Sequence, residues 1–155
     1  MSSKQVNALT IDVEDYYQVS AFEHVLSRSS WPSLESRVER NMDRLLALFS
    51  EHNTKATFFV LGSVAERFPS IVKNIVAEGH ELASHGTAHL RASDQTAEEF
   101  RQDVGDAKRL LEDLSGVAVN GYRAPSFSFT KQNEWVYDVL KEEGYVYSSS
   151  VYPVK

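Results

Sequence analysis

Short apolar runs alternate along the chain with longer segments in which apolar residues recur every three or four positions. Residues 8–13 (ALTIDV) form the first run, and residues 56–61 (ATFFVL) form a second that has no polar interruption after Thr57. A continuous apolar run is typical of a strand that is buried on both faces. Further strands are predicted at residues 81–84, 117–123 and 145–149.

Helical periodicity fills the gaps between these five predicted strands. Ser36 begins the first helix, in which apolar residues at positions 38, 42, 45, 46 and 49 form one stripe. Ser36 with Glu39, and Thr96 with Glu99, have the spacing of a capping box at a helix start. Three helices are predicted to end at glycines, namely Gly79, Gly116 and Gly144.

Strands that alternate with helices predict right-handed βαβ units and a parallel sheet, so the expected fold class is α/β. In such folds ligands bind at the carboxyl ends of the strands. Polar clusters fall at three of these ends: residues 12–15 after the first strand, residues 85–89 after the third, and residues 123–126 after the fourth. We therefore expect one functional site built from three separate segments.

Composition limits the chemistry. A chain of 155 residues predicts one domain, spanning 1–155, and the net charge of −6 argues against a nucleic-acid partner. With no cysteine, any metal must be held by His, Asp or Glu. The N-terminus does not have the pattern of a signal peptide, and no apolar run is long enough for a membrane span, so a cytoplasmic protein is expected.

The segment HGTAH places His85 and His89 four residues apart. Two imidazoles at this spacing can face one metal ion if the loop makes a helical turn. An exposed polar loop is the alternative, but the position after a buried strand favours the metal site. The other three histidines, His24, His52 and His80, have no such context and are predicted to be surface or capping residues.

Asp12, Glu14 and Asp15 place three carboxylates within four residues. A cation or an arginine among them would make their repulsion tolerable, and one carboxylate could bind a metal while another acts as a general base. Arg123 ends the fourth predicted strand and could hold Asp12 through its guanidinium group. A solvated acidic turn and an ordinary surface ion pair are the alternatives.

Four segments resemble the polysaccharide deacetylases of carbohydrate esterase family 4, the NodB-homology domain: TIDVED (10–15), KATFFVLG (55–62), EGHELASHGTAH (78–89) and GYRAPSFS (121–128). The DVEDYYQV opening looks most like the subgroup associated with bacterial exopolysaccharide production. The resemblance implies a (β/α) barrel, here with about five of its strands. It also implies metal-dependent removal of N-acetyl groups from a glycan that contains N-acetylglucosamine, with Zn²⁺ as the expected metal.

The resemblance also implies roles for individual residues. Asp12 matches the general base and Arg123 the arginine that orients it. His85 and His89 match two metal ligands. The third ligand is Glu14 or Asp15, with Glu14 the better match.

In addition, Pro125 is expected to line the substrate groove and the N–H group of Ser126 to bind the oxyanion. The last family motifs, including the histidine that acts as general acid, have no counterpart before Lys155. An inactive fragment that binds metal or sugar, and a metal-dependent hydrolase of linear amides, therefore stay as alternatives. The oligomeric state is not predicted.

Overall fold

The computed structural model describes residues 7–152 and contains a five-stranded parallel sheet in the order β1-β2-β3-β4-β5. Every strand pairs in parallel with its neighbour in the sequence. The predicted α/β class with five parallel strands is confirmed, whereas closure into a barrel stays a prediction. The strands are β1 (Thr10–Val13), β2 (Thr57–Val60), β3 (Glu81–Ser84), β4 (Gly121–Tyr122) and β5 (Tyr147–Ser148).

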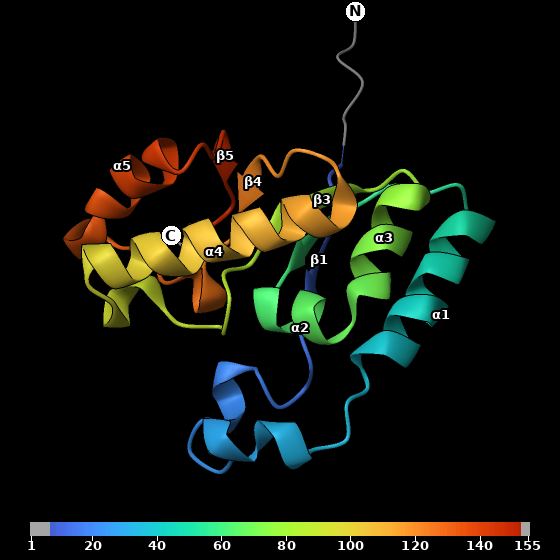
Figure 1. Ribbon diagram of the computed structural model, residues 1–155, viewed down its shortest axis with the longest axis horizontal. Coiled ribbons are helices and arrows are strands. Elements are labelled where there is room, and N and C mark those ends of the chain that lie inside the picture. The colour runs from blue at the N-terminus through green and yellow to red at the C-terminus, as the bar shows by residue number, and fades with distance from the viewer. Residues whose placement is uncertain (1–6, 153–155) are drawn as a thin grey trace, which may run out of the picture.

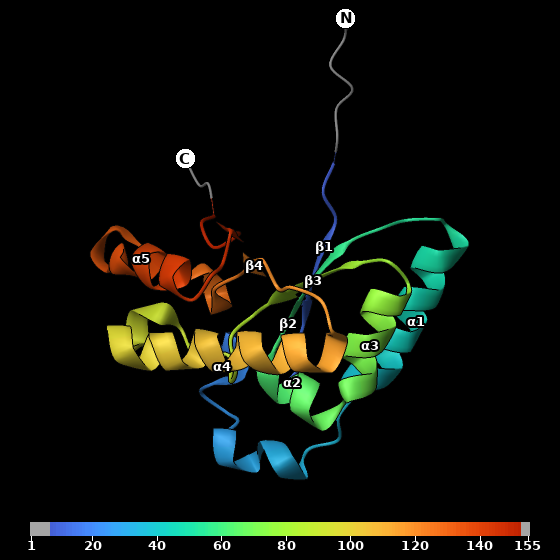
Figure 2. The same ribbon diagram turned by 45° about the horizontal axis from the view of Figure 1, so that its top comes forward.

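Five α-helices connect these strands in the described residues. Figures 1 and 2 show α2, α3 and α4 together on one face of the sheet, with α1 beside α3 and with α5 beside α4. The helices are α1 (Val38–Glu51), α2 (Gly62–Arg67), α3 (Pro69–Ala77), α4 (Ala97–Ser115) and α5 (Trp135–Glu142). None of the described helices is long and apolar enough to cross a membrane.

Within residues 7–152, five short 3-10 helices lie in the loops. Two of them follow β1 and form a separate small layer beyond its carboxyl end (Figure 1). They are η1 (Ser20–Phe22), η2 (Arg28–Ser33), η3 (Ala92–Asp94), η4 (Pro125–Phe127) and η5 (Lys131–Asn133).

The hydrophobic core lies between the sheet and the helices. Alternate strand residues such as Val13, Phe58 and Tyr122 join this core. Phe59 points to the opposite face and is also buried, because the guanidinium group of Arg123 lies 4.1 Å from the centre of its ring. Strand β2 is therefore buried on both faces, as its uninterrupted apolar sequence predicts.

The structure corrects the predicted secondary structure in two places. The segment between β2 and β3 contains two helices, α2 and α3, where one was predicted, and Pro69 begins the second of them. The predicted strands at 117–123 and 145–149 are reduced to two residues each, β4 and β5.

The two predicted capping boxes have different outcomes. Thr96 and Glu99 form the capping box of α4 as predicted. At α1 the prediction is wrong, because the cap comes from the distant side chain of Asp15. Its Oδ2 accepts hydrogen bonds from Ser36 Oγ at 2.6 Å, from Arg37 N at 2.9 Å and from Val38 N at 3.4 Å.

His80 is buried, so the prediction of a surface position is wrong for it, although its N–H group caps α3 by donating to the carbonyl of Ile75 at 3.1 Å. His24 and His52 are exposed as expected. The His80 ring packs edge-on against Phe49 and Phe58. Its Nδ1 accepts a hydrogen bond from Ala56 N at 3.3 Å, which closes the end of the core.

Candidate metal and catalytic site

The three polar segments predicted to meet at the carboxyl ends of the strands do meet there. They surround a cavity of about 210 Å³. The side chains that line it come from β1 and the segment after it, from the loop after β3 and from η4: Asp12, Glu14, Val19, Ser20, His85, His89, Ser126 and Phe127.

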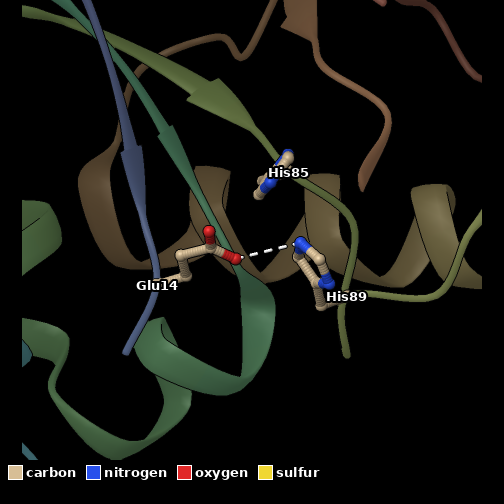
Figure 3. A group of neighbouring side chains, drawn as sticks. All are labelled: Glu14, His85 and His89. Carbon is tan, nitrogen blue, oxygen red and sulfur yellow. Dashed lines mark ion pairs between the residues drawn. The ribbon is translucent and has the colours of Figure 1, made fainter. Parts of the chain in front are cut away.

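Glu14, His85 and His89 form a cluster at the base of this cavity. One carboxylate oxygen and one nitrogen from each imidazole lie within 4.8 Å of one another. Figure 3 shows the two imidazole rings and the carboxylate converging from the loop after β3 and from the end of β1. Both histidines are buried, so the cluster faces the cavity rather than open solvent.

His85 is held in one orientation by the main chain. Its Nδ1 lies 2.7 Å from the carbonyl oxygen of Arg123. Because a carbonyl oxygen only accepts hydrogen bonds, Nδ1 carries the proton of the neutral ring and Nε2 keeps a free lone pair. Burial lowers the pKa of His85, although the nearby Asp12 carboxylate and the bond to the Arg123 carbonyl oppose this effect. The neutral ring that a metal requires is thus the favoured form.

The other two side chains also have the properties of metal ligands. Glu14 Oε2 lies 3.0 Å from His89 Nε2, which is the distance of an ion pair. Even so, Glu14 Oε2 and His89 Nδ1 are buried and have no hydrogen-bond partner among residues 7–152. A buried carboxylate oxygen that accepts no hydrogen bond is costly, and a cation would remove that cost. The donor set of one carboxylate and two imidazoles therefore fits a divalent metal such as zinc.

Asp12 lies beside this cluster and is held by Arg123. Arg123 Nη1 donates to Asp12 Oδ1 at 2.7 Å. The rest of the guanidinium group is fixed by Thr10 Oγ1 at 3.0 Å and by the carbonyl and hydroxyl oxygens of Ser149 at 3.2 and 2.8 Å. Asp12 keeps 30% of its side chain exposed and lines the cavity, so its second oxygen is accessible to a small molecule.

Asp15, the alternative third ligand, faces elsewhere. Its Oδ2 caps α1, and its Oδ1 accepts from Tyr16 N at 3.0 Å. It is not part of the metal-type cluster found in the described residues. The geometry therefore favours Glu14 over Asp15.

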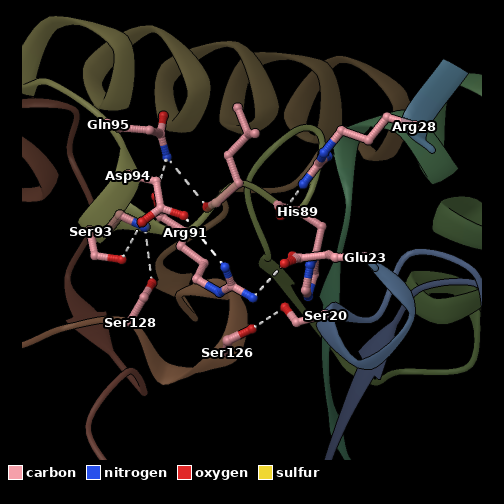
Figure 4. Close-up of polar contacts among 12 residues, drawn as sticks. Ser20, Glu23, Arg28, His89, Arg91, Ser93, Asp94, Gln95, Ser126 and Ser128 are labelled. Atoms are coloured by element: carbon pink, nitrogen blue, oxygen red, sulfur yellow. Dashed lines mark hydrogen bonds and ion pairs between the residues drawn. The ribbon is translucent and has the colours of Figure 1, made fainter. Parts of the chain in front are cut away.

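Pro125 and Ser126 occupy η4, next to the cavity. Ser126 lines the cavity, has a positive φ of 54°, and its Oγ lies 2.5 Å from Ser20 Oγ (Figure 4). Pro125 is buried and is not among the residues that line the cavity. The roles expected for these two residues in substrate and oxyanion binding stay predictions.

Sequence reasoning missed two sets of residues around the site. Val19 and Ser20 line the cavity from η1 and its preceding residue, and no local pattern marks them. Asp103 is buried on α4 and accepts from Thr87 N, inside HGTAH, at 3.0 Å. Its burial raises its pKa. An aspartate on the apolar stripe of a helix was a signal that could have identified it.

Both the sequence and the fold of this chain have known relatives. The sequence matches the polysaccharide deacetylase family over residues 4–148. It is 38% identical over 82 residues to a peptidoglycan-N-acetylglucosamine deacetylase of Bacillus cereus, covering 53% of this chain and 30% of that protein. It is 33% identical over 113 residues to a peptidoglycan deacetylase of Helicobacter pylori, covering 73% of this chain and 38% of that protein.

The fold of this chain also resembles that of a solved structure. A peptidoglycan N-acetylglucosamine deacetylase superposes with a TM-score of 0.65 at 27% identity, covering 91% of this chain and 54% of that one. The chain thus spans about a third of the length of the two curated relatives and about half of the solved one. The match extends over nearly the whole sequence, and the chain belongs to the polysaccharide deacetylase family.

Proposed function

We propose that this chain carries the site of a metal-dependent glycan N-deacetylase, and that residues 1–155 act as one domain. The observation that carries the proposal is the convergence of Glu14, His85 and His89 beside the Asp12–Arg123 pair in one cavity. In this proposal Glu14, His85 and His89 hold a divalent metal, with zinc the best fit to the donor set.

A metal in this position would supply Lewis-acid polarisation of the acetamide carbonyl. Asp12 would accept a proton at its free carboxylate oxygen from the water that attacks that carbonyl. Arg123 would hold Asp12 aimed at the cavity. The backbone N–H group of Ser126 would donate to the oxygen on which negative charge develops. As the C–N bond breaks, the nitrogen would take the proton that Asp12 accepted, which gives acetate and a free amine on the sugar.

The proposed substrate is a polymer that contains N-acetylglucosamine. The named activities of the two curated relatives support this class, since both are peptidoglycan deacetylases. The DVEDYYQV segment favours an exopolysaccharide within it. The cavity holds about 210 Å³, which suits an acetamide group and part of a sugar ring rather than a whole disaccharide.

Acetate release tests the proposal. The metal-free chain is incubated with N-acetylglucosamine oligomers, with and without added Zn²⁺, and acetate is measured enzymatically. The proposal expects release that depends on Zn²⁺ and is lost in Asp12→Asn, while His24→Ala, a change on the exposed surface, leaves it unchanged. Zinc-dependent cleavage of a linear ureide without any acetate release would instead support the alternative amide hydrolase. Zinc binding with no turnover of either would support the inactive fragment.

A further inference from the structure

The loop that carries both candidate histidines, residues 85–89, has an unusual backbone. Gly86 has φ of 75° and His89 has φ of 54°. A left-handed conformation suits glycine but is unfavourable for a histidine. Something outside the loop must therefore hold His89 in the conformation that brings it to His85 and Glu14.

Part of the support comes from the start of α2. Gly62 N donates to the carbonyl of Gly86 at 2.8 Å, and Ser63 N donates to the carbonyl of Thr87 at 2.9 Å. These bonds fix the first half of the loop. They leave the N–H of Thr87 and the carbonyls of Ala88 and His89 for other partners.

Two charged side chains supply those partners from two different elements, α4 and η2. Asp103 on α4 accepts from Thr87 N through Oδ1 at 3.0 Å, and its own carbonyl accepts from Thr87 Oγ1 at 2.9 Å. Arg28 in η2 donates through Nη1 to the carbonyl of Ala88 and through Nη2 to the carbonyl of His89 at 3.0 Å. Figure 4 shows Arg28 reaching the loop from the side of η2.

The charges match the backbone groups that they meet. A carboxylate accepts from an N–H group and a guanidinium group donates to carbonyl groups, and such charge-assisted bonds are stronger than neutral ones. Asp103 is 8% exposed, and Gly86 packs so closely on it that a Cβ there would lie 2.6 Å from Asp103 Oδ2. Neither side chain is a member of the metal-type cluster.

Asp103 also borders a second cavity of about 440 Å³, which other acidic residues line. The contacts of these residues do not favour a cation site there. Asp94 pairs with Arg91 and Asp106 pairs with Arg109. Glu99 accepts from Thr96 in its capping box. These carboxylates already have partners, and Asp103 alone among them is buried and bonded to the loop.

We propose that Asp103 and Arg28 are positioning residues that clamp the 85–89 loop, so that His89 reaches the metal site. The proposal rests on the proposed metal site for its functional meaning. The clamp itself is a property of the backbone and is measurable without metal.

The first test measures zinc affinity by competition with a chromophoric chelator, using only protein shown to be folded by circular dichroism. Loss of an outer partner of a metal ligand typically weakens binding about 10- to 100-fold, and that range is expected for Asp103→Ala and Arg28→Ala. Asp103→Asn keeps an oxygen that can accept from Thr87 N, so it should restore most of the affinity. Asp106→Asn and Arg44→Ala, both on exposed helix surface, are the matched controls.

Affinities of folded Asp103→Ala and Arg28→Ala within twofold of the wild type would overturn the proposal. If Asp103→Ala does not fold, Arg28→Ala decides, because Arg28 is exposed and its loss should not unfold the chain. A lower melting temperature in both variants with unchanged zinc affinity would indicate a merely structural role and would also overturn it.

The second test uses the metal-free protein and separates the clamp from the proposed function. Amide exchange at Thr87, followed by NMR, should be about 10-fold or more faster in Asp103→Ala than in Asp106→Asn, because the N–H loses its acceptor. If the wild-type chain binds no zinc, the proposed metal site is wrong. The exchange rate of the Thr87 amide is then the measurement that tests the clamp. Equal exchange in the two variants would overturn it.

Discussion

Arg123 and Asp12 lie 111 positions apart in the sequence, and their side chains meet at 2.7 Å at the rim of the sheet. The side chain of Arg123 is 10% exposed and that of Asp12 is 30% exposed, so the carboxylate is open to the cavity and the guanidinium group that holds it is not. The carbonyl of the same Arg123 fixes His85. One residue directly after β4 thus orients both the candidate general base and a candidate metal ligand.

Replacing Arg123 should therefore damage turnover more than binding. In Arg123→Gln the Asp12 carboxylate loses its cation and its fixed orientation, and kcat should fall by about 100-fold, the lower range of general-base contributions. KM should change little, because Arg123 does not line the cavity. Initial rates of acetate release measure this. Arg123→Lys keeps the positive charge but loses the planar guanidinium group, so its kcat should lie between those of the wild type and Arg123→Gln. A wild-type kcat in Arg123→Gln would contradict the assignment.

The two neighbouring acids should separate into a ligand and a structural cap. Asp15→Asn leaves the first N–H groups of α1 without a charged acceptor and should reduce the free energy of unfolding by about 1–3 kcal/mol, with zinc affinity unchanged. Glu14→Gln should abolish zinc binding with a small effect on stability. Urea unfolding and zinc titration of both variants measure this. The reverse pattern would make Asp15 the ligand.

The contrast between these two acids also indicates how far the sequence was informative. The carboxylate cluster, the histidine pair and Arg123 could be placed at one rim because strand ends were recognisable from apolar runs. The role of Asp15 as the cap of α1 could not be predicted, since its hydrogen-bond partners, Ser36 to Val38, are more than 20 residues away in the sequence.

Local signals were reliable where the interaction was local. Strand β3 matches its predicted limits, 81–84, and the Thr96–Glu99 capping box forms within four residues. Ser36 and Glu39 have the same spacing, but a tertiary contact replaces their box. His80 was misjudged for the same reason: its burial depends on Phe49 and Phe58, which reach it only in the folded core.

Buried His80 should make stability depend on pH. Burial and the nearby Lys55 lower its pKa from 6.5, against the opposing effect of Glu78. As the pH falls through 6.5, His80 therefore binds a proton in the unfolded chain more readily than in the folded chain. The contribution of neutral His80 to stability is complete above pH 6.5 and is lost as the pH drops below it.

Urea unfolding at pH 7.5 and 5.5 measures this effect. His80→Asn keeps an acceptor for Ala56 N but does not titrate. Between pH 7.5 and 5.5 its free energy of unfolding should therefore fall less than that of the wild type, by up to about 1.4 kcal/mol per pH unit. The difference between variants isolates His80 from the other buried histidines. His52→Asn, an exposed control, should behave like the wild type. Equal pH dependence in His80→Asn and the wild type would refute the assignment.

The central claim is that Glu14, His85 and His89 hold a metal ion, and zinc titration of the metal-free chain by calorimetry tests it most directly. We predict one Zn²⁺ bound per wild-type chain, no binding in His85→Ala or His89→Ala, and unchanged binding in His24→Ala. A wild-type chain that binds no zinc, or a His85→Ala chain that binds it as the wild type does, would contradict the claim.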